Sequence, residues 1–186
     1  NPYLTIKPEY EAEQVRVFGE MYKKGYIEKG LKPVYWCAAC ETALAEAEVE
    51  YADHTSTSIY VRFKFDEDAV LKINKFIDTK DKDVYAVIWT TTPWTIPSNM
   101  AISMHPRYEY TFFTYKNNVY VAAQELLGAF LKDVEWEESE IEVLGTCKGQ
   151  DLELLNTNHP LLNRKSPIIL GEDVTLDAGT GSVHTA

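Results

Sequence analysis

The chain has 186 residues, of which 45% are hydrophobic and 25% are charged, an ordinary globular composition that argues against disorder, collagen and low complexity. No apolar run approaches the roughly 20 residues that a membrane-spanning helix needs. Asp and Glu number 29 against 18 Lys and Arg, and the resulting net charge of −11 argues against nucleic acid as an extensive partner.

The beginning of the chain and its cysteines suggest where the protein works. The chain starts at Asn1-Pro2 with neither an initiator Met nor a signal peptide, so we expect a piece excised from a longer protein. Three cysteines are too few, and odd in number, for a disulfide framework. We therefore expect a reducing compartment, the cytoplasm.

The first predicted element is a helix over residues 8–30, where Pro8 suits the first helical position and Gly30 the stop. Its apolar face carries Val15, Phe18, Tyr22 and Tyr26. Residues 34–36 are predicted to be extended. Residues 45–51 alternate apolar residues with Glu, and although Ala and Glu are strong helix formers, the alternation favours a strand.

The middle of the chain has clearer β patterns. Residues 58–65 alternate and predict a strand whose buried face carries Ile59, Val61, Phe63 and Phe65. Asp66 can cap a short helix that carries Val70, Leu71, Ile73 and Phe76, and residues 80–83 form a polar turn. The continuous β-branched and aromatic run at 84–90 is typical of a strand buried on both faces.

Residues 108–115 and 119–122 predict a hairpin around Asn117-Asn118. The remaining expected elements are a short helix at 124–132, strands at 135–143 and 167–170, a flexible loop at 177–181 and a final segment at 182–186. Because strands outnumber helices and do not alternate with them regularly, we predict a mainly β fold, a β-barrel with peripheral helices.

The most unusual stretch is T-T-T-P-W-T-I-P-S-N at residues 90–99, which follows the run at 84–90. Its two prolines stiffen the loop and remove backbone donors, so the Thr hydroxyls and the Asn99 amide are presented on a rigid support. Trp94 adds an apolar surface with one N–H. Such a loop could hold a small polar ligand, or a base and sugar; the alternative is Thr side chains that only cap and pair locally.

A second unusual stretch is G-T-G-S-V-H at residues 179–184. Its glycines allow the backbone to approach a ligand closely, and His184 is a natural acid, base or hydrogen-bond partner near pH 7. No P-loop Lys follows, so a nucleotide triphosphatase is not supported. The alternative is a turn followed by a structural histidine.

Cys37 and Cys40 form a C-x-x-C pair that could supply half of a zinc site or a thioredoxin-like pair, although no βαβ pattern flanks it. Two unliganded thiols at a turn are the alternative that this chain alone favours, since Cys147 is distant. The other histidines show no ligand spacing and are expected on the surface or in loops: His54, His105 and His159.

Taken together, these segments resemble one family. W-T-T-T-P-W-T-I-P-S-N at 89–99 and L-D-A-G-T-G-S-V-H-T-A at 176–186 look like the two signatures of the editing domain (connective peptide 1) of bacterial isoleucyl-tRNA synthetase, a class I aminoacyl-tRNA synthetase. Residues 32–51 are similar to the start of that insertion, and N-P-Y-L-T at 1–5 to the catalytic domain before it. T-T-T-P-W stands where the valyl and leucyl relatives have T-T-R-P.

The resemblance implies a division into a helical connection to the catalytic domain (1–30) and an editing domain truncated at its C-terminal side (31–186). The implied activity is hydrolysis of valine from mischarged tRNA(Ile) at the 3′-terminal adenosine. One missing methylene provides only about 1–3 kcal/mol of discrimination, for which isoleucine against valine in this family is itself the standard example. The alternatives are a non-catalytic module that binds the tRNA 3′ end and a zinc-ribbon-like interaction domain.

The resemblance also implies roles for individual residues. Thr91, Thr92 and His184 are the expected catalytic residues, and His184 is expected to line the aminoacyl side and to help exclude isoleucine. The expected substrate-binding residues are Thr90, Trp94, Thr95, Asn99, Gly179, Thr180, Gly181 and Val183. The family's Asp that holds the substrate ammonium lies after the V-H-T-A string, beyond Ala186.

Editing of this kind needs no cofactor. Zinc is expected only if Cys37 and Cys40 join a second pair further along the insertion, and ATP and Mg²⁺ belong to the synthetic domain. The expected partners are the 3′ CCA end of tRNA(Ile) carrying valine and the remaining synthetase domains, with no membrane contact and a monomeric state. If this domain binds only the single-stranded CCA end, the phosphate-rich body of the tRNA lies on other domains. Binding of the tRNA is then compatible with the acidic composition of this chain.

Overall fold

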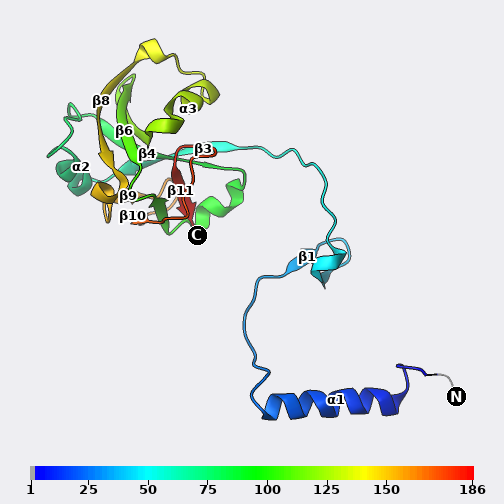
Figure 1. Cartoon of the computed structure of the whole chain (residues 1–186). Coiled ribbons are helices and arrows are strands. Elements are labelled where there is room, and N and C mark those ends of the chain that lie inside the picture. Colours follow the sequence, from blue (N-terminus) through cyan, green and yellow to red (C-terminus); the bar gives the residue numbers. More distant parts are fainter. Residues whose placement is uncertain (1–2) are drawn as a thin grey trace. The chain divides into compact units, whose positions relative to one another are not determined.

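The computed structural model describes residues 3–186, so Asn1 and Pro2 of the N-P-Y-L-T segment lie outside it. The chain divides into two compact units, Asn1–His54 and Thr55–Ala186. The first unit contains helix α1 (Pro8–Lys23) and a hairpin of strands β1 (Tyr35–Cys37) and β2 (Thr42–Leu44) (Figure 1). Both unusual loops belong to the second unit, while the boundary expected at residue 31 stays a prediction.

The helix predicted over residues 8–30 begins as expected but ends earlier. Gly25 has a φ of +75°, and the Tyr26 N–H closes the last turn on the Met21 carbonyl at 3.1 Å. Because this left-handed conformation is unstrained only for glycine, Gly25 and not Gly30 ends the helix.

The strand predicted at residues 45–51 is wrong. The chain forms a short 3₁₀-helix, η1 (Glu46–Glu48), and the Glu48 carboxylate accepts the Ala45 N–H at 2.7 Å. β1 and β2 pair only with each other, so residues 45–51 have no neighbouring strand to pair with. The helix propensity of Ala and Glu therefore decides the conformation of this segment.

The second unit is built on one mixed sheet in the order β11-β5-β10-β9-β3-β4-β7-β6-β8. Its strands are β3 (Ile59–Phe65), β4 (Asp83–Thr90), β5 (Ala101–Met104), β6 (Glu109–Tyr115), β7 (Asn118–Ala123), β8 (Ile141–Lys148), β9 (Asn156–Asn158), β10 (Lys165–Leu170) and β11 (Ser182–Thr185). β4 with β7 and β10 with β5 run parallel, and the other neighbours run antiparallel.

The mainly β fold is confirmed, but the predicted barrel does not close. Within residues 3–186, β11 and β8 remain the two end strands, because β11 forms its ladder with β5 and β8 forms its ladder with β6. β11 packs beside β4 without pairing with it. This packing brings the end of the chain to the start of the threonine-rich loop.

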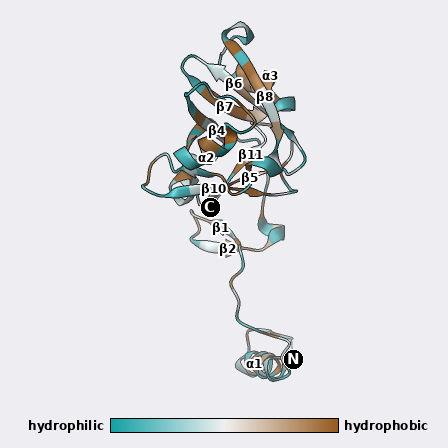
Figure 2. Ribbon diagram, turned by 90° about the vertical axis from the view of Figure 1, so that its left-hand side faces the viewer, coloured by the Kyte–Doolittle hydropathy of each residue, from teal (hydrophilic) through white to brown (hydrophobic). Residues whose placement is uncertain are grey.

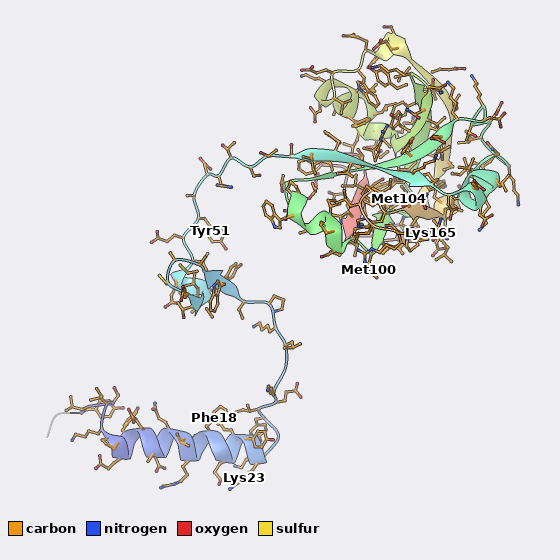
Figure 3. All side chains as sticks on the ribbon, turned by 180° about the vertical axis from the view of Figure 1, so that it is seen from behind. Phe18, Lys23, Tyr51, Met100, Met104 and Lys165 are labelled. Atoms are coloured by element: carbon orange, nitrogen blue, oxygen red, sulfur yellow. The ribbon has the colours of Figure 1, made fainter. Side chains whose placement is uncertain are left out.

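The core lies on the strands, as the hydropathy colouring of β4 and its neighbours shows (Figure 2). Phe63 and Phe65 of β3 are buried, and the middle of β4 is buried as predicted. Met104 on β5 is fully buried, whereas Met100, just before that strand, is 58% exposed (Figure 3).

Two helices lie at the periphery of the second unit: α2 (Glu67–Ile73) and α3 (Leu127–Asp133) (Figure 1). The Asp66 carboxylate accepts the Ala69 N–H at 2.8 Å, which confirms the predicted cap of α2. α3 continues from the 3₁₀-helix η3 (Gln124–Leu126), so the helix predicted at 124–132 is also confirmed. No helix among residues 3–186 has the length and apolar character needed to cross a membrane.

The strand predicted at 135–143 is wrong in position. The 3₁₀-helix η4 (Glu138–Glu140) occupies its middle, and β8 begins at Ile141. β5 and β9 were not predicted, because each is only a few residues long and lacks a clear alternation. A further 3₁₀-helix, η5 (Gly149–Leu152), follows β8.

Candidate functional site

A pocket of about 300 Å³ lies where the end of β4 meets the loop that leads into β11. Thr90 and Thr91 line it from one side, and residues 179–183 line it from the other. Its remaining lining residues are Trp89, Asp173, Thr175, Asp177 and Ala178. The fold therefore brings the two unusual loops of the sequence to one cavity.

The glycines in the second loop are required by the backbone and by close packing. Gly179 and Gly181 have φ values of +77° and +71°. A Cβ on Gly181 would lie 2.5 Å from the Ala123 Cβ, and one on Gly179 would lie 3.0 Å from the Trp89 Cβ. Any larger residue would therefore push the loop away from the sheet.

The loop is fixed where it enters β11, not flexible as predicted. The buried Thr180 hydroxyl donates to the Val87 carbonyl, and the Thr180 carbonyl accepts the Ala123 N–H at 2.8 Å. The Gly181 carbonyl accepts the Tyr110 hydroxyl at 2.6 Å. These bonds tie one wall of the pocket to three neighbouring strands.

The threonine-rich loop forms a 3₁₀-helix, η2 (Pro93–Ser98), and satisfies part of its own hydrogen bonding. The Thr90 hydroxyl accepts the Thr92 N–H at 3.0 Å, and the Thr95 hydroxyl donates to the Thr92 carbonyl at 2.8 Å. Thr91 is exposed and lines the pocket. Thr90 and Thr95 thus bond locally, while Thr91 of the same loop is left exposed at the pocket.

Asn99 ends η2 and is fully buried with its amide group held in one orientation. Its Nδ2 donates to the Ala101 carbonyl at 2.8 Å, which identifies the nitrogen. Its Oδ1 accepts the Ser166 hydroxyl at 2.6 Å. The second Nδ2 hydrogen is therefore available to His184, whose Nδ1 lies 3.3 Å away.

His184 lies between the two ends of η2. Its Nε2 is 2.7 Å from the Thr95 hydroxyl, whose single proton is already donated to the Thr92 carbonyl. The Thr95 oxygen must then accept, so Nε2 carries the proton, while Nδ1 accepts from Asn99. The network fits one state of the ring, the neutral Nε2–H tautomer.

The electrostatic environment favours the same state. Burial lowers the pKa of His184, and the nearby His159 lowers it further. A second ring proton would also place an N–H at Nδ1 directly opposite the Asn99 amide N–H. His184 is therefore neutral at pH 7, with both nitrogens engaged by protein groups.

Several predicted site residues lie next to the pocket but do not line it: Thr92, Trp94, Thr95, Asn99 and His184. Trp94 is 75% exposed, and the other four belong to the η2–His184 network. Val183 is 48% exposed and lines the pocket. The predicted residues thus form two adjoining groups, the pocket wall and the network beside it.

Residues that sequence reasoning missed complete the pocket. Ser182 is 3% exposed, and its hydroxyl has no hydrogen-bond partner within the described chain. Asp173 and Asp177 add two carboxylates, and no Lys or Arg is among the lining residues. Asp177 and Ser182 lie inside the second signature, but nothing in their local pattern distinguished them from spacer residues.

Two of the histidines expected on the surface or in loops do lie in loops, but they are buried. His105 and His159 are each 5% exposed. The His159 Nε2 bonds to the Ile96 carbonyl at 2.9 Å, so this ring contacts η2 directly. Long-range packing of this kind leaves no signal in residue spacing.

Cys37 and Cys40 lie in the first unit, at the turn of the β1–β2 hairpin. The Cys40 N–H donates to the Cys37 sulfur at 3.3 Å, and this hydrogen bond is the main reason that the pKa of Cys37 is lowered. Among residues 3–186, no group of three or more His, Cys, Asp or Glu side chains could hold a metal ion. The pair alone does not make a closed zinc site.

Comparison with known proteins places the chain in a family. Residues 1–148 match the model for "tRNA synthetases class I (I, L, M and V)". The isoleucine–tRNA ligase of Desulforamulus reducens is 59% identical over 187 residues, covering 100% of this chain and 19% of the relative. The chain spans about a fifth of the length of the curated relatives it matches.

Solved structures match the fold at low sequence identity. The crystal structure of GlLeuRS-CP1 has a TM-score of 0.59 at 17% identity, covering 69% of this chain and 54% of that one. The P. knowlesi cytosolic leucyl-tRNA synthetase editing domain has a TM-score of 0.56 at 16% identity, covering 72% and 59%. The chain therefore shares its fold with these domains.

Proposed function

The chain belongs to the class I tRNA synthetases of the I, L, M and V group, and we propose that its Thr55–Ala186 unit hydrolyses valine from mischarged tRNA(Ile) within a bacterial isoleucyl-tRNA synthetase. The relatives named isoleucine–tRNA ligase support tRNA(Ile) as the substrate tRNA. The likeness to leucyl-tRNA synthetase editing domains supports an editing role for this fold. Hydrolytic correction is needed because binding alone discriminates poorly between side chains that differ by one methylene.

The observation that carries this proposal is the pocket between Thr91 and the loop at residues 179–183. Its volume of about 300 Å³ is at the small end of ligand sites, which suits one aminoacyl group with part of a ribose. The carboxylates of Asp173 and Asp177 give the pocket a negative charge that suits a cationic aminoacyl ester, and the absence of Lys and Arg from the lining disfavours a phosphate.

In the proposed reaction, water attacks the ester carbonyl carbon, and the bond to the ribose oxygen breaks to release valine and tRNA. Thr91 and backbone N–H groups of the pocket wall donate hydrogen bonds that steady the tetrahedral oxyanion. Thr92 and His184 contribute through the network that sets the position of η2. Because both nitrogens of His184 are occupied, its role is to orient these groups and not to accept a proton from water.

The remaining substrate contacts extend from the pocket. We propose that exposed Trp94 stacks against the terminal adenine, and that the glycine loop approaches the aminoacyl group through its backbone. The partners are the 3′ CCA end of tRNA(Ile) carrying valine and the other domains of the synthetase. The reaction needs no metal in this unit and takes place in the cytoplasm.

The alternative is a module that binds the tRNA 3′ end without catalysis. The test is to incubate Val-tRNA(Ile) with the full-length synthetase in the absence of ATP, and to compare the parent with a Thr91→Ala variant. Ester hydrolysis that depends on Thr91 supports the proposal. Tight binding of the tRNA end without hydrolysis would support the alternative.

A further inference from the structure

We propose that the segment at residues 159–166 is a brace that holds η2 in place, and that His159 is its main positioning residue. Its effect on catalysis rests on the proposed editing function. Three side chains of the segment donate to η2 or to its end: His159 Nε2 to the Ile96 carbonyl at 2.9 Å, Arg164 Nη2 to the Pro97 carbonyl at 2.8 Å, and Ser166 Oγ to Asn99 Oδ1 at 2.6 Å.

η2 benefits from external support because a short 3₁₀-helix has poor hydrogen-bond geometry and this one contains two prolines. It is a six-residue 3₁₀-helix, and its two prolines supply no N–H. The backbone bonds at its two ends are Thr95 N–H to the Thr92 carbonyl at 3.1 Å and Asn99 N–H to the Ile96 carbonyl at 3.0 Å. The Pro97 carbonyl receives its donor from Arg164.

His159 is fixed on both sides of its ring. Nδ1 accepts the backbone N–H groups of Leu161 and Leu162 at 3.1 and 3.0 Å, so Nε2 carries the proton that is donated to the Ile96 carbonyl. The ring is 5% exposed and packs edge-on against Phe63 of the core. One nitrogen therefore shapes the brace, while the other holds η2.

The brace bonds next to one of the two points where η2 meets His184, at Ile96 beside Thr95, and directly to the other, Asn99. Thr95 and Asn99 lie near the two ends of η2, and each contacts one nitrogen of the His184 ring. The brace is itself anchored to the sheet, because the Thr157 hydroxyl donates to the Ser166 carbonyl at 2.7 Å. A shift of η2 would move Thr95 and Asn99 relative to His184, and would move the neighbouring Thr91 at the pocket.

The two functions of the His159 ring can be separated by a matched pair of substitutions. In His159→Gln the amide nitrogen can still reach the Ile96 carbonyl, but the cap on Leu161 and Leu162 is lost. In His159→Asn the amide oxygen can still cap the brace, but the side chain is too short to reach Ile96. Leu161→Ala serves as the control, because Leu161 is 66% exposed and the change keeps its backbone N–H.

The full-length synthetase is the protein to measure, with two readouts. Hydrogen–deuterium exchange of peptides covering residues 92–100 reports whether η2 is held, and steady-state hydrolysis of Val-tRNA(Ile) reports how the position of η2 affects the reaction. We expect His159→Asn to speed exchange in this peptide and to lower kcat roughly ten- to hundredfold with little change in KM, since misplacement by about 1 Å can have such an effect. His159→Gln and Leu161→Ala should stay close to the parent.

The inference is overturned if His159→Asn exchanges like the parent, or if His159→Gln is the more damaging change, because His159 would then serve only its own loop. Faster exchange without a change in kcat would also overturn the positioning role. A parent enzyme that hydrolyses no Val-tRNA(Ile) would instead refute the proposed function, while the exchange rates would still decide whether the brace holds η2.

Discussion

Thr95 Oγ1 and His184 Nε2 lie 2.7 Å apart, although the two residues are separated by 89 positions in the chain. This contact joins the threonine-rich loop to the second signature and fixes the proton of His184 on Nε2. It also shows that the histidine is engaged by the protein before any substrate arrives. In the proposed reaction, its role is therefore to hold η2 in position beside the pocket wall.

Replacing Thr91 and Thr92 together with Ala should reduce the hydrolysis of Val-tRNA(Ile) and leave aminoacylation with isoleucine intact. Thr91 loses a hydroxyl that lines the pocket, while the Thr92 carbonyl that accepts from Thr95 is retained. The measurement is the accumulation of Val-tRNA(Ile) beside the rate of Ile-tRNA(Ile) formation. An equal loss of isoleucine activation would show that the two residues serve the synthetic site or the fold.

Replacing Val183 with Ala should admit isoleucine to the pocket. The sequence alone assigned the excluding wall to His184, but Val183 is the residue of this pair that lines the pocket. Relief of a clash of about 1–3 kcal/mol would raise hydrolysis of Ile-tRNA(Ile) roughly ten- to hundredfold. The control is Thr185→Ala, an exposed change on the same strand that does not line the pocket.

His184→Ala should behave differently from Val183→Ala. Removing the ring disconnects Thr95 from Asn99, so hydrolysis of Val-tRNA(Ile) should fall while Ile-tRNA(Ile) remains excluded. If His184→Ala instead releases hydrolysis of Ile-tRNA(Ile), the histidine is the excluding wall after all.

Hydrolysis should persist to a lower pH than an ordinary histidine would allow. Burial lowers the pKa of His184, so the neutral form that the network requires remains dominant as the pH falls through about 6.5, the usual histidine value. The acid limb of the single-turnover pH profile should therefore lie below that value. An acid limb above it would mean that the charged form is favoured in the folded enzyme, contrary to the hydrogen-bond network.

Ser182→Ala separates ligand contact from folding. The Ser182 hydroxyl is buried without a partner in the described chain, and such a group costs about 1–3 kcal/mol. The variant should unfold at the same temperature as the parent or at a higher one. Because this buried oxygen is not exposed to the pocket, hydrolysis of Val-tRNA(Ile) should stay close to that of the parent. Lower thermal stability, or a several-fold loss of hydrolysis, would show that the hydroxyl has a partner in the fold or in the substrate.

The hydrophobic pattern of the sequence predicted strands correctly where their apolar side chains pack into the core. The alternation at β3 and the continuous apolar run at β4 mark strands that pack on the core, and both were found. The segment at 45–51 alternates too, but it has no strand to pair with, so helix propensity decides its conformation. β5 has four buried residues and no pattern of its own, because its place is set by β10 and β11.

The two motifs of the candidate site were predictable from the sequence, but the hydrogen bonds that connect them were not. Thr91 and Gly181 were identified through their signatures, and the fold brings both to one pocket. Ser182 and His159 were missed because an unpaired buried hydroxyl and a buried ring that holds a distant carbonyl are properties of packing, and one sequence does not display them.

The most direct test of the proposed editing function is the rate at which the full-length synthetase hydrolyses Val-tRNA(Ile) and Ile-tRNA(Ile) without ATP. An editing site of this kind should release valine fast and isoleucine slowly, and should lose the valine activity when Thr91 is replaced by Ala. Equal rates for the two esters, or valine release that does not respond to Thr91→Ala, would contradict it.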